Sequence, residues 1–219
     1  NTVLTDLESV DVLTKSEEPA LPAHLAGILE NVDPSVPESV VDQLGQLLQK
    51  YSKAFSVNEY DLGWTDKIKH TIDTGDNPPA RQALRRVPLA QREIIDKHID
   101  EQLRQGIIKP AQSPFASNLV IVKKHDGTTR CCVDFRNLNA ISRHDSYPLP
   151  SMDQCIDALG GDNAWFSCLD MRSSYHQVAM DEKDAEKTAF ICHRGSFMYR
   201  TMPMGLRNSG ATFQRLMDM

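Results

Sequence analysis

The stretch Phe166-Ser-Cys-Leu-Asp-Met171 decides how this chain is interpreted. It is an apolar, β-prone run that carries one acid, Asp170, at its end, and it is typical of a short strand. A carboxylate at the end of a buried strand can hold a hard divalent cation such as Mg²⁺ through oxygen. Asp also begins helices and turns, because its side-chain oxygens accept hydrogen bonds from backbone amides. The stretch alone leaves both roles open for Asp170, a metal ligand or a cap.

The composition is that of a chain with a hydrophobic core and no membrane span. Of its 219 residues 40% are hydrophobic, and no apolar run approaches the roughly 20 residues that cross a bilayer. The five cysteines are odd in number and form no Cys-x-x-Cys pair, so they do not indicate a zinc site or a disulfide framework. No secretion signal opens the sequence. We expect reduced thiols and an intracellular protein.

The charge is divided unevenly along the chain. The net charge is −9 over residues 1–80 and +3 over residues 81–219. Within the second part, the segment from Arg104 to Arg143 carries seven basic residues against Asp126 and Asp134. Such a segment either contacts phosphates, which dominate nucleic-acid affinity, or forms an ordinary solvated face. Charge alone does not choose between them.

The pattern of apolar residues predicts an α+β fold of helices and hairpins. Residues 1–34 are acidic and broken by prolines, which predicts a linker. Residues 56–88 are rich in turn formers and predict extended chain, with one strand at His70–Thr74. Predicted helices cover residues 37–55, 89–105 and 151–159 and the segment from Ser209. Predicted strands cover residues 118–124 and 129–135 around an Asp126-Gly127 turn, residues 166–171, and residues 188–192 and 197–201.

Nine short motifs then occur in one order between residues 113 and 214, and together they resemble the reverse transcriptase of Gypsy-class LTR retrotransposons. Any one of them is weak evidence, but the ordered set at compatible spacings is specific. They are Ser113-Pro-Phe-Ala-Ser117, Lys123-Lys-His-Asp-Gly127, Val133-Asp-Phe-Arg136 with Leu138-Asn139, Tyr147-Pro-Leu-Pro150, Leu169-Asp170, Tyr175-His-Gln177, Lys187-Thr-Ala-Phe190, Met202-Pro-Met-Gly-Leu206 and Ala211-Thr-Phe-Gln214.

The resemblance implies a right-hand polymerase, of which this chain would hold the fingers and the first part of the palm. Residues 1–80 would be an upstream connector with one helix near residues 37–55. Residues 81–219 would be the fingers and an incomplete palm, with the Asp126-Gly127 hairpin as the fingers tip. The implied chemistry is template-directed nucleotidyl transfer onto a primer end, in which two Mg²⁺ ions clamp the attacking and leaving oxygens.

The resemblance also assigns roles to single residues. Asp170 is similar to the first metal-binding acid of the family, and Met171 would offer its backbone carbonyl to a metal. The incoming dNTP would contact Lys124 and Arg130 in the fingers, Tyr175 as a gate against a ribose 2′-OH, and the Met204-Gly205 loop beneath the base pair. A solvated hairpin for the two cations and a core position for Tyr175 stay open as alternatives. Arg136 and Arg143 are expected template contacts, and His176 is expected to pack.

The chain departs from the family pattern at several positions. The family palm continues to two adjacent acids in a Tyr-x-Asp-Asp setting, which does not occur in these 219 residues. We therefore expect this fragment alone not to polymerise. Ser209-Gly210 stands where the family has Ala-Pro, Ser174 where Gly is common, and Met204 where Phe is common. These changes are typical of a divergent element.

The implied partners are an RNA or DNA template with its primer, dNTP substrates, and the protease, RNase H and integrase of a Pol polyprotein. The implied location is the cytoplasm or a virus-like particle. The alternative to a polymerase fragment is a non-catalytic nucleic-acid-binding remnant of a retroelement.

Overall fold

A computed structural model gives the fold and describes residues 21–58, 61–123, 125–161, 163 and 166–219. The chain divides into two compact units, with the boundary in the sequence between Val57 and Asn58. Residues 61–80 therefore pack within the second unit. The predicted domain boundary at residue 80 rests on sequence similarity and stays a prediction.

The first unit is a pair of helices followed by a short 3₁₀ turn. The predicted helix at residues 37–55 is present as α2 (Glu38–Lys50), with η1 (Ser52–Ala54) after it. The prediction of a linker over residues 1–34 is wrong for α1 (Ala23–Glu30), and residues 1–20 lie outside the described part. Leu25 of α1 and Leu48 of α2 are both buried, and the two helices contact each other. This apolar contact holds α1 in place despite the prolines around it.

The second unit contains a two-stranded and a five-stranded sheet with helices packed on them. The two-stranded sheet pairs β1 with β5 in parallel, and the five-stranded sheet has the order β2-β7-β6-β3-β4. Its strands are β1 (Thr65–His70), β2 (Ile108–Pro110), β3 (Ser117–Lys123), β4 (Thr129–Val133), β5 (Val178–Met180), β6 (Phe190–Cys192) and β7 (Gly195–Tyr199). Its helices are α3 (Leu89–Arg104), α4 (Arg136–Ile141), α5 (Met152–Leu159) and α6 (Ser209–Met217), with 3₁₀ turns η2 (Ser174–Gln177) and η3 (Ala185–Thr188).

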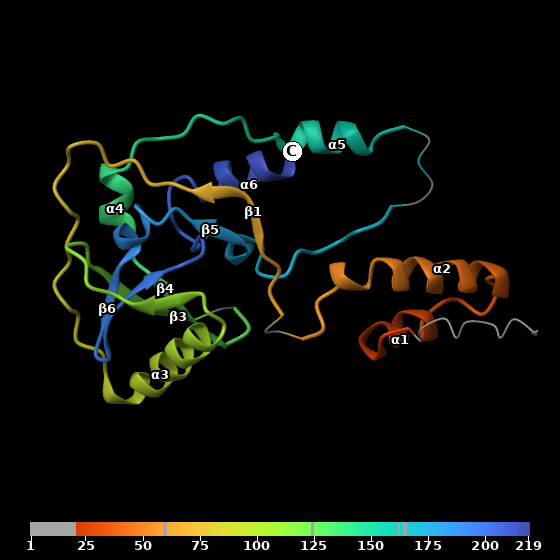
Figure 1. The fold of residues 1–219 in the computed structure, drawn as a ribbon, viewed down its shortest axis with the longest axis horizontal. Helices are drawn as coiled ribbons and strands as arrows, with labels where there is room; N and C mark the ends of the chain where they lie inside the picture. Colours follow the sequence, from red (N-terminus) through yellow and green to blue (C-terminus); the bar gives the residue numbers. More distant parts are fainter. Residues whose placement is uncertain (1–20, 59–60, 124, 162, 164–165) are drawn as a thin grey trace, which may run out of the picture. The chain divides into compact units, whose positions relative to one another are not determined.

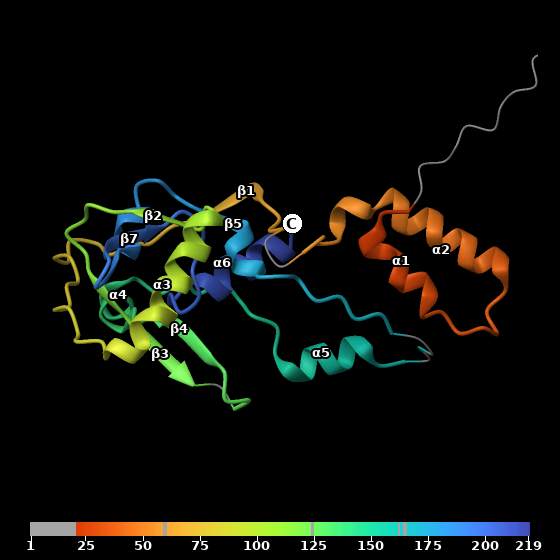
Figure 2. The same ribbon diagram turned by 90° about the horizontal axis from the view of Figure 1, so that it is seen from below.

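Strand β3 joins the two hairpins of the larger sheet. It pairs with β4 antiparallel, with Val122 opposite Arg130, and with β6 in parallel through Ser117 and Asn118. The hairpin turn contains Gly127 at φ +81°, a backbone conformation that glycine adopts without a Cβ clash. Figure 2 shows β3 and β4 side by side, as the two strands of one hairpin next to α3. The predicted hairpins at residues 118–135 and 188–201 are thus confirmed.

Helix α3 supplies one wall of the core. The predicted helix at residues 89–105 is confirmed. Its apolar stripe is buried, because Ile95 and Ile99 are fully buried and pack in one cluster with Phe190, Val178 and other apolar residues. Burial of such a side chain contributes about 1.5–3 kcal/mol. The helix contacts β2 and β4, while α6 contacts β1 (Figure 1).

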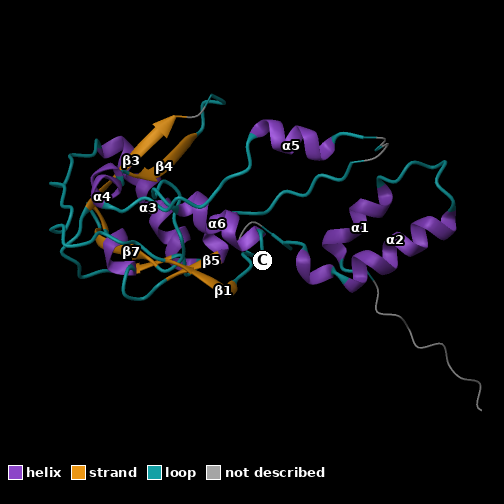
Figure 3. Ribbon diagram, turned by 90° about the horizontal axis from the view of Figure 1, so that it is seen from above, coloured by secondary structure: helices purple, strands orange, loops and turns teal. Residues whose placement is uncertain are grey.

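The predicted strand at residues 166–171 does not form. The structure has an extended loop there, between α5 and η2 (Figure 3), and Phe166 and Leu169 are 64% and 84% exposed. A strand needs a neighbouring strand to pair its backbone N–H and C=O groups. The strand pairs of the described residues include none with this segment. The segment is apolar as a strand would be, but a strand also needs a pairing partner, which the apolar pattern does not specify.

Several short elements also differ from prediction. The strand predicted at His70–Thr74 lies earlier, as β1, and pairs with β5. Helix α4 and strands β2 and β5 were not predicted, because three to six residues are too few to show a period. The predicted helix at residues 151–159 is confirmed, and Ser151 and Gln154 form a reciprocal capping box at its start.

The motif Lys187-Thr-Ala-Phe190 has a structural role that sequence did not reveal. Lys187 Nζ donates to the Ile72 carbonyl at 2.6 Å, and Asp184 accepts from the Ile72 amide at 2.9 Å. The two side chains also form an ion pair of 2.7 Å. Together they satisfy both backbone groups of Ile72 and attach the chain after β1 to η3.

His70 is a second attachment between distant segments. Its side chain is buried, and Nδ1 shares a hydrogen bond of 2.8 Å with the Thr212 hydroxyl on α6. Burial lowers the pKa of His70 to about 4, against the attraction of Asp184 and Asp145. The imidazole is therefore neutral in the folded protein at neutral pH.

This burial predicts an acid-labile fold. Because the pKa of His70 is lower when folded than the ordinary 6.5, unfolding takes up a proton between these values. The free energy of unfolding is unaffected above pH 6.5 and falls as the pH drops toward 4, by up to about 3 kcal/mol from this residue.

Urea unfolding followed by circular dichroism from pH 7 to 4.5 measures this slope. His70→Gln is expected to flatten it, whereas the same change at the exposed His144 leaves it as it was. An equal slope in wild type and His70→Gln would contradict the assignment.

Candidate functional site

The second unit contains an open cavity of about 550 Å³. Its walls come from β4, α3, the η2 region, Tyr199 at the end of β7 and the loop after it. Arg130, Met204 and Gly205, three of the residues predicted to contact a dNTP, line this cavity together. Segments more than 70 residues apart in sequence therefore meet at one site.

Arg130 lies on β4 and points to the Met204-Gly205 loop. Its guanidinium donates to the Met204 sulfur, and both side chains are exposed to solvent. The cross-strand pairing of Arg130 with Val122 fixes its place near the hairpin tip. Lys124, the other predicted cation of this hairpin, lies outside the described residues.

The Met204-Gly205 loop is held by Asn139 of α4. The Asn139 amide donates to the Gly205 carbonyl at 2.8 Å, and its oxygen accepts from the Arg207 amide at 2.9 Å. Gly205 has φ +89°, a conformation that few other residues adopt. Arg207 returns a bond from its guanidinium to the Asn139 carbonyl at 3.2 Å. Asn139 therefore sets the position of this wall of the cavity.

Tyr175 lies beside the cavity and is not among its lining residues. Its ring is half-buried and packs on Phe213 of α6 at 5.4 Å between centroids. A Cβ at Gly210 would lie 3.8 Å from the Tyr175 hydroxyl, so a larger residue there would touch it. This contact fits the alternative of a core aromatic, and the role as a sugar gate stays a prediction.

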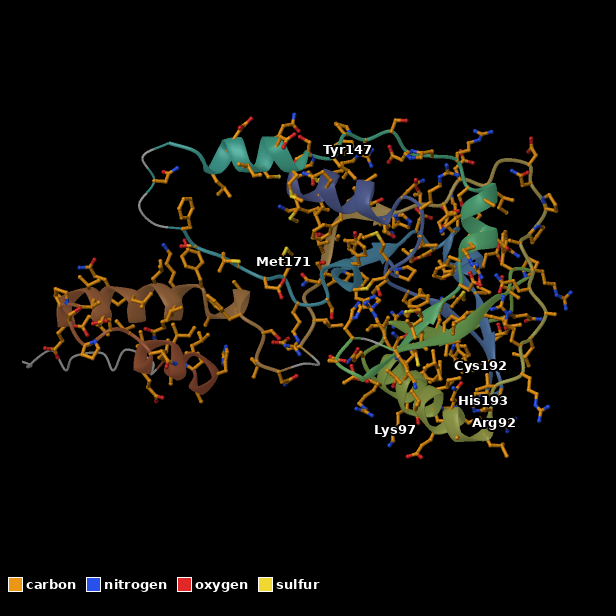
Figure 4. All side chains as sticks on the ribbon, turned by 180° about the vertical axis from the view of Figure 1, so that it is seen from behind. Arg92, Lys97, Tyr147, Met171, Cys192 and His193 are labelled. Carbon is orange, nitrogen blue, oxygen red and sulfur yellow. The ribbon has the colours of Figure 1, made fainter. Side chains whose placement is uncertain are left out.

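Asp170 and Met171 lie in the loop before η2, outside the cavity lining. Both are exposed, and Figure 4 shows Met171 on this extended segment. A Mg²⁺ ion takes about six oxygen ligands in octahedral geometry, usually from one or two carboxylates together with waters and substrate phosphates. Among the described residues no group of three or more His, Cys, Asp or Glu side chains is arranged to hold a metal. The described residues thus offer donor atoms of the right kind without a complete metal site.

Burial controls the charge of the cavity. It lowers the pKa of His176 to about 4 and also lowers that of His98, so both imidazoles are neutral at neutral pH. It raises the pKa of Cys131 to about 11, so this thiol stays protonated and is a poor nucleophile. Of the described lining residues, only Arg130 then carries a full charge, which favours an anionic ligand.

Several lining residues were not predicted from sequence. Gln102 and His98 come from α3, one turn apart on the face that looks into the cavity, and Ser173 adopts the left-handed conformation with φ 43°. His176, predicted to pack, stacks on the Tyr199 ring at 6.2 Å. The polar residues among the apolar stripe of α3 were the available signal. Arg136 and Arg143 pair with Asp134 and Asp73, and neither lines the cavity.

Comparison with known families identifies this region. Residues 122–219 match the family model described as "Reverse transcriptase (RNA-dependent DNA polymerase)". Residues 122–219, a little under half of the chain, are thus similar to reverse transcriptases. The match includes β4, α4, the Asp170 segment and the Met204-Gly205 loop, and so most of the cavity wall lies in the reverse transcriptase region.

Curated relatives extend the similarity upstream. The retrovirus-related Pol polyprotein from transposon 297 of Drosophila melanogaster is 38% identical over 80% of this chain. That from transposon gypsy of the same organism is 32% identical over 84%. The chain spans 17% and 18% of the length of these two relatives. The predicted Gypsy-class resemblance is thereby confirmed.

Solved structures confirm the predicted fold. The foamy viral protease-reverse transcriptase in complex with an RNA/DNA hybrid has a TM-score of 0.70 at 20% identity, and covers 84% of this chain and 25% of its own. The selenomethionine-labelled prototype foamy virus protein has a TM-score of 0.65 at 22% identity, and covers 89% and 26%. The α+β fold is that of part of a polymerase. No helix in the described ranges has the length and apolarity needed to cross a membrane.

Loss of the Asn139 side chain is expected to loosen the Met204-Gly205 loop without unfolding the chain. In Asn139→Ala the Arg207 amide loses its acceptor, so its hydrogen exchange should quicken, at a cost of about 1 kcal/mol. Hydrogen exchange read by NMR measures the effect. Asn137→Ala, at an exposed position of the same helix, is the control and should leave the Arg207 amide unchanged. Unchanged exchange in Asn139→Ala would contradict the clamp.

Proposed function

We propose that this chain is the fingers and first palm segment of an RNA-directed DNA polymerase from a Gypsy-class retrotransposon. The observation that carries the proposal is the cavity in which Arg130, Met204 and Gly205 meet, within a region similar to reverse transcriptases. The reaction is template-directed addition of a deoxynucleotide to a primer 3′ end. As these relatives are much longer than the chain, the activity is proposed for the intact protein.

The cavity suits the triphosphate end of an incoming nucleotide. Arg130 supplies a forked cation that can donate several hydrogen bonds to phosphate oxygens. The protonated Cys131 thiol adds no negative charge that would weaken this attraction. Because the imidazoles are neutral, Arg130 supplies the positive charge of the described cavity lining. The Met204-Gly205 loop, fixed by Asn139, would support the pair formed by the template base and the incoming base.

Mg²⁺ is the proposed cofactor, with two ions in the intact enzyme. The Asp170 carboxylate and the Met171 carbonyl would supply oxygen ligands, and further ligands would come from the two acids that the family resemblance implies. When bound, such ions neutralise phosphate charge and stabilise the attacking and leaving oxygens. The proposed partners are a primed RNA or DNA template and dNTPs, with the other Pol domains in the intact protein.

A non-catalytic nucleic-acid-binding remnant is the second candidate. The observation that favours it is the position of Asp170, which is exposed and outside the cavity lining. The two candidates agree on nucleic-acid binding and differ on whether Asp170 is needed for turnover.

Removal of the Arg130 guanidinium should weaken nucleotide binding. Charge-assisted hydrogen bonds to a phosphate contribute about 1.5–3 kcal/mol, so Arg130→Ala should raise the Kd for dTTP by roughly tenfold or more. Calorimetry with the primed template poly(rA)/oligo(dT) and Mg²⁺ present measures it. Arg92→Ala, which removes an exposed arginine of α3, is the matched control and should not change the Kd. A dTTP affinity equal to wild type in Arg130→Ala would exclude the proposed phosphate contact.

Asp170→Asn separates the two candidate functions. It keeps the side-chain shape and removes the charge that a Mg²⁺ ligand needs, so primer extension should fall by at least about a hundredfold, or roughly 3 kcal/mol. The assay uses the protein from the complete reading frame, on poly(rA)/oligo(dT) with Mg²⁺. Full activity in Asp170→Asn would remove the proposed metal role, and no extension by wild type would favour the remnant.

A further inference from the structure

A basic segment outside the cavity lies against the fingers hairpin. Residues 81–86 contain Arg81, Arg85 and Arg86 and no acid, and all three arginines are exposed. The segment begins with a parallel bridge from Arg81 to Ala116, next to β3. It belongs to neither the cavity nor the basic stretch noted between residues 104 and 143.

Asn118 locks this segment in place. Its side chain is 2% exposed, and its amide nitrogen donates to Gln82 Oε1 at 3.0 Å and to the Ala83 carbonyl at 2.8 Å. Its oxygen accepts from the Arg85 amide at 3.0 Å. Since a buried amide group must keep its hydrogen bonds, the backbone of Arg85 has little freedom. The backbone of Arg85 is therefore fixed beside β3.

Arg85 and Arg136 share one buried carboxylate. Arg136 binds both oxygens of Asp134, with Nε and Nη2 each at 2.7 Å, and Arg85 Nη2 lies 3.6 Å from Oδ2. The Asp134 side chain is 7% exposed, against 57% for Arg85 and 79% for Arg136. The carboxylate thus lies beneath the two guanidiniums, which face the solvent.

Neutralising Asp134 does not require both arginines. The bidentate contact with Arg136 already balances its single charge and holds its pKa at about 2, so it stays ionised. Arg85 adds a second cation at a longer distance, which leaves a local charge of about +1 with unused donors. A pair of fixed guanidiniums with surplus charge is suited to a phosphodiester group.

The pair lies beyond one end of the strand that carries Arg130. Asp134 is four residues after Arg130 and directly follows the end of β4. At the rise of an extended strand this is a distance of roughly 13 Å. A stacked nucleic-acid strand with about 3.4 Å per nucleotide covers this distance in roughly four steps. The pair is therefore within reach of the same template that would pair with a nucleotide in the cavity.

We propose that Arg85, held beside Arg136 by Asp134 and Asn118, binds the phosphate backbone of the unpaired template strand ahead of the nucleotide site. The inference rests on the proposed function and adds a residue upstream of the family match. Arg85 contributes affinity and no base selection, because phosphate contacts carry no sequence information.

Fluorescence anisotropy with two labelled primer–templates tests the proposal on this chain. One probe is blunt, and the other has a 5′ template overhang of about six nucleotides, longer than the reach estimated above. In Arg85→Ala the slope of log K against log salt should fall by about 0.7 on the overhang probe, the value for one single-strand phosphate, and stay unchanged on the blunt probe. Arg85→Lys keeps a cation and should restore most of the slope.

The controls separate this inference from the proposed function. Arg92→Ala removes an exposed arginine of α3, which Figure 4 shows near His193 and away from the Tyr147 side, and should match wild type on both probes. A wild-type salt slope for Arg85→Ala on the overhang probe, or an equal loss of slope on both probes, would overturn the role of Arg85. Either result would leave the proposed function intact. Absence of binding by wild type to either probe at low salt would overturn the proposed function with it.

Discussion

The buried amide of Asn118 is the constraint on which the arrangement of the fingers depends. Asn118 sits where β3 leaves its parallel pairing with β6, and its own carbonyl accepts from the Asp134 amide at 2.8 Å. An amide at 2% exposure costs free energy unless each of its polar atoms is paired. Pairing them draws residues 82–85, β3 and the end of β4 into one place. The basic segment and the strand that carries Arg130 are fixed together as a result.

The cavity that contains Arg130 is built by contacts between segments far apart in the sequence. Strand β4 presents Arg130 to the Met204-Gly205 loop, and Asn139 on the next helix holds the other side of this loop. Lys187, Asp184 and His70 tie the chain around β1 to η3 and α6. Residues 61–121, upstream of the family match, are thus part of the same folded unit. This explains in structural terms why the similarity to transposon Pol polyproteins extends beyond the matched region.

Local secondary-structure elements were predictable from the sequence, whereas the tertiary contacts between them were not. Short local patterns predict the helices at residues 89–105 and 151–159 and the Asp126-Gly127 hairpin, so sequence was enough for them. The strand at residues 166–171 failed because pairing depends on a distant partner. The ordered motifs led to Arg130, Met204 and Gly205. They did not lead to Gln102 or Arg85. The importance of these two residues comes from distant neighbours in the sequence, Tyr199 for Gln102 and Asn118, 33 residues away, for Arg85.

The central claim is that the cavity beside β4 receives the nucleotide. Photo-crosslinking of this chain with an azido-dATP on a primed template, followed by peptide mapping, tests it most directly. The account predicts labelling within residues 129–133 or 202–206 that unlabelled dATP suppresses. Labelling confined to α5 or to residues 81–86, or labelling that dATP does not suppress, would contradict it.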